Sequence, residues 1–188
     1  MKRKIIFAAG LLLLISCNNE KKDDTKMDDG SKATMSASDK KAASELLDLS
    51  AADPVKKSFA AFSKADVDGM SADYDDKIRY TWSSGDSLIG KQAVKDYYKG
   101  RWKLIDSLSV SNEIVLPVQV NESQQPQYAP AGKWVLYWAM VNVKYKNGKK
   151  INFWMHNVNH MNDAGKIDFI GQYLDRHQII EATKDLMK

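Results

Sequence analysis

The sequence has a single cysteine, Cys17, and no long hydrophobic run. One cysteine cannot form an intramolecular disulfide, so a folded domain must depend on burial of apolar side chains. The apolar stretch from Ile5 to Ile15 is shorter than the roughly 20 residues that a helix needs to cross a bilayer. This length excludes a permanent membrane-spanning helix at that place.

Basic residues at positions 2–4 precede the apolar stretch, which is the layout of a secretory signal peptide. The segment Leu14-Ile15-Ser16-Cys17 that ends it resembles the lipobox of bacterial lipoproteins, where an aliphatic, a tolerant and a small position precede the cysteine that receives diacylglycerol. The resemblance implies a signal peptide over residues 1–16, a palmitate-bearing Cys17 and a partner in the lipid bilayer. A soluble secreted protein with a free thiol is the alternative.

Clustered charge is scarce in the remaining chain. The sequence has 28 Lys and Arg against 24 Asp and Glu, and three of the basic residues belong to the signal segment. Without these three the net charge is about +1. Because attraction to phosphates needs a clustered positive surface, no nucleic-acid partner is expected.

The region from Asn18 to Ser44 is polar and poor in aliphatic and aromatic residues, so it cannot offset the entropy of folding. We predict a disordered tether over residues 17–44 and a domain over 45–188, with its core at about 53–180. Within the tether, Lys22-Asp23-Asp24 is similar to a signal that sends some lipoproteins to the outer surface. A plain solvated linker is the alternative. We expect an outer-membrane lipoprotein of the cell envelope, either periplasmic or surface-exposed.

Helical periodicity comes first in the domain. Asp53-Pro54 is a typical helix start, with Asp53 as the cap, and apolar residues at spacings of four and three follow to about Lys64. A short second helix is expected to end near Tyr74, and a third over 91–104. The apolar residues that indicate the first and third helices are Val55, Phe59 and Phe62, then Val94, Tyr97, Tyr98 and Trp102.

Strand patterns follow. Alternation over 78–82 predicts a half-buried strand, and longer strands are expected over 106–116, 133–146, 149–162 and 166–175. Asn147-Gly148 predicts a two-residue turn with positive φ at both positions. A looser turn at 162–165 would make the last three strands an antiparallel meander. Three prolines indicate an irregular loop over 117–131, and the whole order predicts one α+β domain.

Short motifs in this order resemble the SnoaL-like branch of the nuclear transport factor 2 superfamily. They are Tyr80-Thr81-Trp82, Gly85 to Lys91, Asp163 to Ile167, and Tyr173-Leu174-Asp175. The resemblance implies N-terminal helices packed on a strongly curved antiparallel sheet, which form a cone that holds small molecules in some members. Members include cyclases, isomerase relatives, dehydratases and modules without enzymatic activity, so the fold does not select a function.

The tryptophan-bearing strands suggest a pocket. Both faces of 134–141 are apolar, so the sequence does not decide which face points inward. Placing the tryptophan faces inward gives a cavity for a flat apolar ligand. The residues predicted to bind it are Tyr80, Trp82, Trp138, Trp154, His156 and Tyr173. An aromatic core with a hydrogen-bonded histidine is the alternative.

Catalysis has two candidate bases, and enzymatic activity is left open. The resemblance makes Asp175 a candidate, because the family often places a proton-transferring acid there, whereas a solvated turn or ion-pair partner is the alternative. His156 is the second candidate. His156 and His160 would lie roughly 13 Å apart on a strand, so no metal is expected, and no motif indicates a cofactor.

The leading interpretation is a membrane-anchored domain that binds a small apolar or aromatic ligand. One alternative is an isomerase, cyclase or dehydratase that uses Asp175 or His156 as general base. The other is a homodimerisation or partner-docking module that uses the open face of the sheet.

Overall fold

The computed structural model of the chain describes residues 42–123 and 125–187. The predicted signal peptide, Cys17 and the tether as far as residue 41 lie outside these residues. Ser44, the last residue assigned to the tether, is already the first residue of a strand. None of the helices in the described part has the length and apolarity needed to cross a membrane.

The elements follow the predicted order, helices first and long strands last. In chain order they are β1 (Ser44–Leu46), the 3-10 helix η1 (Leu49–Ala52), α1 (Asp53–Phe62), α2 (Val67–Met70), β2 (Tyr74–Trp82), β3 (Ser87–Ile89), α3 (Lys91–Trp102), β4 (Ile105–Val120), β5 (Gly132–Tyr145), β6 (Lys150–Met161), β7 (Ile167–Tyr173) and α4 (Arg176–Thr183). The sequence did not predict η1, α4 or the short edge strands β1 and β3.

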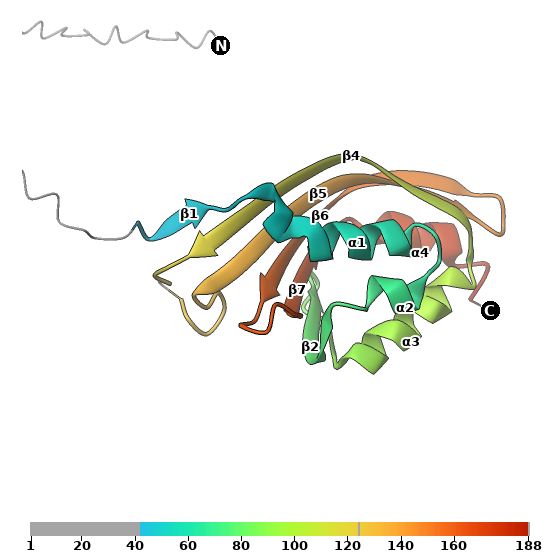
Figure 1. Cartoon of the computed structure of the whole chain (residues 1–188). Helices are drawn as coiled ribbons and strands as arrows, with labels where there is room; N and C mark the ends of the chain where they lie inside the picture. The colour runs from blue at the N-terminus through green and yellow to red at the C-terminus, as the bar shows by residue number, and fades with distance from the viewer. Residues whose placement is uncertain (1–41, 124, 188) are drawn as a thin grey trace, which may run out of the picture. The chain divides into compact units, whose positions relative to one another are not determined.

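The strands form one sheet in the order β1-β4-β5-β6-β7-β2-β3. Every neighbouring pair is antiparallel except β2 and β7, which are parallel. The predicted meander of β5, β6 and β7 is therefore confirmed, and so are the α+β class and the curved sheet. Figure 1 shows the long strands arching over α1, α2 and α3, and no helix of the described residues covers the other face of the sheet.

Side-chain caps begin η1 and α2, whereas α1 has Pro54 in its first turn, which has no backbone N–H to satisfy. Asp48 accepts a hydrogen bond from the Ser50 N–H (2.9 Å) at the start of η1. Ala52, rather than the predicted Asp53, is the cap of α1, because η1 leads directly into that helix. Asp66 caps α2 by accepting from the Gly69 N–H (2.7 Å).

Both predicted hairpins are present, but the loop at Asn147-Gly148 has three residues rather than the predicted two. The Gly148 N–H donates to the Tyr145 carbonyl (2.9 Å), and only Gly148 has positive φ (83°), so Asn147 does not take the predicted left-handed conformation. The same arrangement recurs where the Gly165 N–H donates to the Asn162 carbonyl (2.8 Å). This is a turn followed by a glycine bulge, the usual three-residue hairpin.

The predicted loop over 117–131 is wrong in its first four residues. β4 continues to Val120, pairs with β5 on one side and receives β1 on the other. Pro117 fits this strand because its carbonyl still accepts a hydrogen bond from the Leu47 N–H (3.0 Å), outside the short β1 ladder.

Candidate ligand-binding cavity

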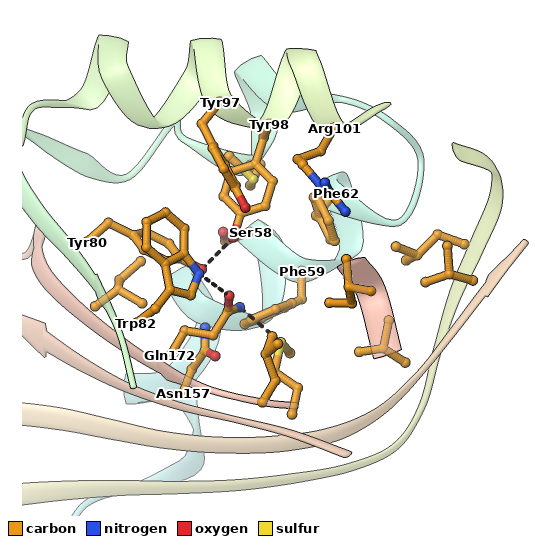
Figure 2. Close-up of a pocket in the computed structure, with 18 of the residues that line it drawn as sticks. Ser58, Phe59, Phe62, Tyr80, Trp82, Tyr97, Tyr98, Arg101, Asn157 and Gln172 are labelled. Atoms are coloured by element: carbon orange, nitrogen blue, oxygen red, sulfur yellow. Dashed lines mark hydrogen bonds between the residues drawn. The ribbon is translucent and has the colours of Figure 1, made fainter. Parts of the chain in front are cut away.

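A cavity of about 120 Å³ lies between the concave face of the sheet and the helices α1, α3 and α4. Its wall is mostly aromatic and aliphatic, and Figure 2 shows side chains entering it from the helices and from the sheet. The aromatic residues that line it are Phe59, Phe62, Tyr74, Tyr80, Trp82, Tyr97, Tyr98, Tyr145 and Phe153. This site therefore presents large ring surfaces to whatever occupies it.

Tyr80 and Trp82 line this cavity, as predicted. Their polar atoms are already paired: the Tyr80 and Tyr98 hydroxyls lie 2.6 Å apart, and the Trp82 indole N–H donates to the Gln172 side-chain oxygen (2.9 Å). Gln172 lies on β7 directly beside Trp82 of the neighbouring strand β2, so this bond joins two adjacent side chains of the cavity wall (Figure 2). These bonds hold the two rings in fixed positions for contact with a ligand.

The buried tyrosine hydroxyls in the wall stay protonated. Burial raises the pKa of Tyr74 to about 12, with a partly opposing hydrogen bond from Ser58. Burial likewise raises the pKa of Tyr80 and of Tyr98 above the ordinary phenol range. These groups can exchange neutral hydrogen bonds but do not act as phenolate bases at physiological pH.

One polar atom in the wall has no hydrogen-bond partner among the described residues. Asn157 lies on β6 with 1% of its surface exposed, lines the cavity, and its Oδ1 is buried without a partner. Its strand neighbour Asn159 differs, because its Nδ2 donates to the Val135 carbonyl (2.9 Å). Asn157 therefore contributes a buried, unpaired acceptor to a mostly apolar wall.

The only charged side chains among the described residues that line the cavity are arginines. Arg176, at the start of α4, is paired with Asp86 (2.6 Å) and its guanidinium lies 5.3 Å from the Trp82 ring centre. Arg101 reaches the wall from α3. In this part of the chain no Asp, Glu or His lines the cavity.

Comparison with solved structures places this arrangement among known folds. An LEH-like epoxide hydrolase of M. tuberculosis is 16% identical, with 70% of this chain and 87% of that chain covered at a TM-score of 0.53. TerC, co-crystallized with polyporic acid, is 13% identical at a TM-score of 0.53 and covers 71% of this chain and 98% of its own. A nuclear transport factor 2-like protein of unknown function from Burkholderia pseudomallei is 16% identical, with 70% and 95% covered at a TM-score of 0.53.

The domain has the nuclear transport factor 2-like fold. At these identities the similarity shows the fold alone. No protein-family model matches the chain, and no curated protein sequence does.

Within this nuclear transport factor 2-like cone, the prediction that the tryptophan-bearing faces of β5 and β6 point inward is wrong. The side chains that face the cavity come from the other face of each strand, including Val141 and Val143 on β5 and Phe153 and Met155 on β6. Trp138 and Trp154 therefore do not line it, and Trp154 is 51% exposed. Both faces of β5 are apolar, so composition alone did not decide between them.

The remaining predicted pocket residues also lie outside the cone cavity. His156 stacks between Trp138 (ring centres 4.4 Å apart) and Tyr173 (5.8 Å) on the outer face of the sheet. Burial lowers the pKa of His156, which keeps the imidazole neutral. The prediction of His156 as a base inside the cavity and of Tyr173 as a lining residue is wrong, because register places both on the opposite face.

Asp175 does not line the cavity either. Its carboxylate caps α4, accepting from the His177 backbone N–H (2.9 Å) and from Gln178 Nε2 (3.2 Å). The unpredicted helix α4 turns this side chain toward its own N-terminus, where anions are favoured. The position of the predicted catalytic acid is thus a helix cap.

A metal site was not expected, and the described residues contain no group of three or more His, Cys, Asp or Glu able to hold one. His160 is paired with Asp168 (Nδ1 to Oδ1, 2.6 Å) at one end of the outer face.

Proposed function

We propose that this domain binds a small, flat and largely apolar molecule that carries a hydrogen-bond donor. The observation that supports it is a cavity lined with aromatic rings whose wall contains the free Asn157 Oδ1. An unsatisfied buried acceptor costs about 1–3 kcal/mol, and a ligand N–H or O–H would remove that cost.

The volume limits the ligand's size. At roughly 10–15 Å³ per water position, the cavity of about 120 Å³ holds about ten waters. A molecule of one or two fused rings matches this space. The co-crystallization of TerC with polyporic acid is consistent with small-molecule binding in this fold.

Binding is proposed rather than proton abstraction because the described lining has no carboxylate or imidazole. The tyrosine hydroxyls, whose pKa values are raised, do not replace such a base. Any reaction in the cavity would have to draw on neutral donors and the arginines.

Naphthol should stabilise the full-length chain in a thermal-shift titration, and naphthalene should stabilise it less, because only naphthol donates to Asn157. Ligand that binds the folded state alone adds about 2.7 kcal/mol at one hundred times its Kd. Asn157→Leu should remove the advantage of naphthol, and Val141→Phe should prevent both from binding by filling the cavity.

Trp154→Ala is the matched control, because Trp154 lies on the outer face and should not affect binding. The proposal fails if neither compound shifts the melting temperature. It also fails if Trp154→Ala weakens binding while Val141→Phe leaves it intact.

We further propose that the domain is attached to a bacterial envelope membrane through lipid on Cys17. The lipobox-like segment, the short apolar run before it and the absence of any second cysteine support this attachment. The choice between periplasmic and surface display rests on Lys22-Asp23-Asp24 and belongs to the same proposal.

A second candidate function is self-association through the outer face of the sheet. An apolar patch lies there on β4, β5, β6 and β7, and it includes Ile114 (55% exposed), Trp154 (51%) and Tyr173 (50%). Strand register places Ile114, Trp138, His156 and Tyr173 in one row across these strands. A patch of this kind on a twisted sheet is typical of an interaction surface, and a second copy of the chain would cover it symmetrically.

Light scattering should therefore show a dimer that Trp154→Glu converts to a monomer, because a carboxylate in the interface would be buried without a partner. Ile89→Glu is the control, since Ile89 is more exposed (63%) than Trp154 but lies on the edge strand β3. A monomeric wild type, at concentrations well above micromolar, would rule out this function.

A further inference from the structure

The cavity wall contains one positive charge without a carboxylate partner. Arg176 is neutralised by Asp86, as described above. None of the ion pairs formed by the described residues involves Arg101. Its neighbours on the same helix, Lys95 and Lys99, both pair with Asp68 instead. Lys91, at the start of α3, also lacks a carboxylate, but its ammonium donates to the Ala72 and Tyr74 carbonyls (3.5 and 3.3 Å) and does not line the cavity.

The surroundings of Arg101 do not supply a counter-charge. Figure 2 shows its guanidinium descending from α3 toward Phe62, and the side chain is partly buried. It interacts with Tyr145, but burial raises the pKa of that phenol, so it stays neutral. A guanidinium at an apolar wall loses part of its hydration, and an anion is what would compensate for it.

The position of Arg101 in the last turn of α3 offers another explanation for a cation here, because a positive charge at a helix C-terminus interacts favourably with the helix dipole. Lys99 occupies the same turn and serves that purpose from the outer side. Helix stabilisation does not require a side chain directed into the cavity. The helix dipole therefore does not explain why Arg101 points toward the cavity.

We propose that the ligand bound in this cavity is an aromatic hydroxy acid, whose carboxylate is held by Arg101 and whose hydroxyl donates to Asn157. This inference rests on the proposed function. Arg101 enters from α3 and Asn157 from the sheet, on opposite walls of the cavity (Figure 2). The planar guanidinium can bind a carboxylate through two parallel hydrogen bonds. The aromatic side chains between Arg101 and Asn157 would pack against the flat ring of the ligand.

The test compares coumarate with its neutral amide, coumaramide, by calorimetric titration of the full-length chain at neutral pH. The two probes have the same ring and hydroxyl and differ in the charge of one end. Coumarate should bind at least about tenfold more tightly, because hydrogen bonds to a charged group are worth more than neutral ones. Arg101→Gln should remove that preference, and Arg101→Lys should keep part of it.

Lys99→Gln is the matched control, since it removes a cation from the same turn of α3 without touching the cavity, and it should leave the preference unchanged. Should Arg101→Gln unfold the domain, the comparison of the two probes on the wild type still decides.

Equal affinity of the wild type for coumarate and coumaramide would overturn the anion assignment while leaving the proposed binding function standing. Loss of the preference in Lys99→Gln would also overturn it, because the effect would then be general electrostatics. Failure of naphthol, coumarate and coumaramide alike to bind would overturn both proposals.

Discussion

Replacing Cys17 with alanine is expected to abolish the incorporation of labelled palmitate completely. No other cysteine is present in the sequence, so the thiol that receives the lipid cannot be replaced by another. A single acyl chain gives only marginal membrane binding, with an association constant of about 10⁴ M⁻¹, whereas two chains anchor stably. On the proposed attachment at Cys17, the variant therefore has no lipid anchor.

Incorporation of label is the measurement, because an uncleaved signal segment could keep the variant in a membrane pellet without lipid. Ser16→Ala is the control: it keeps a small residue before the cysteine and should still be labelled. Label retained by Cys17→Ala would refute attachment at Cys17, and label absent from the wild type would favour the soluble secreted alternative.

Periodicity predicted the elements because each long one buries one face. The face of α1 made by Val55, Phe59 and Phe62 packs where its spacing indicated, at the cavity wall. The meander of β5, β6 and β7 followed from two short glycine-containing turns. These are local signals, and they carry no information on the parallel pairing of β2 with β7.

The lysines beside the β5–β6 turn are a local signal for which faces of these strands point inward. Lys144 and Lys150 pair across the hairpin on the outer face of the sheet. Counting back in steps of two from Lys144 gives Trp138, and counting forward from Lys150 gives Trp154. Charged residues beside the turn of the hairpin thus predict that the tryptophans share their outer face.

The sequence did not predict the two polar residues of the site, Asn157 and Arg101. Asn157 lies on the buried face of β6, where an alternation pattern favours apolar residues, and nothing local distinguishes it from the satisfied Asn159. Arg101 belongs to a helix with several other basic residues. Only the packing of α3 against the sheet brings these two positions to one cavity.

Gly132→Ala is expected to destabilise the domain by about 3 kcal/mol or more, measured by urea denaturation. Gly132 has φ of +141°, a conformation that residues with a side chain rarely adopt, and a Cβ there would lie 2.6 Å from His160 Nε2. That ring cannot withdraw easily. Its Nδ1 is held by Asp168 at 2.6 Å, and Trp134 packs against it with ring centres 4.8 Å apart.

Gly148→Ala separates the two causes, because Gly148 also has positive φ (+83°) but nothing lies within 4 Å of its added Cβ. It should cost only the backbone strain, about 1–2 kcal/mol. In a His160→Ala background the cost of Gly132→Ala should fall by at least about 1 kcal/mol, since neighbouring residues couple in a double-mutant cycle. If the free-energy costs of the two substitutions simply add, contact with His160 does not contribute to the cost of Gly132→Ala.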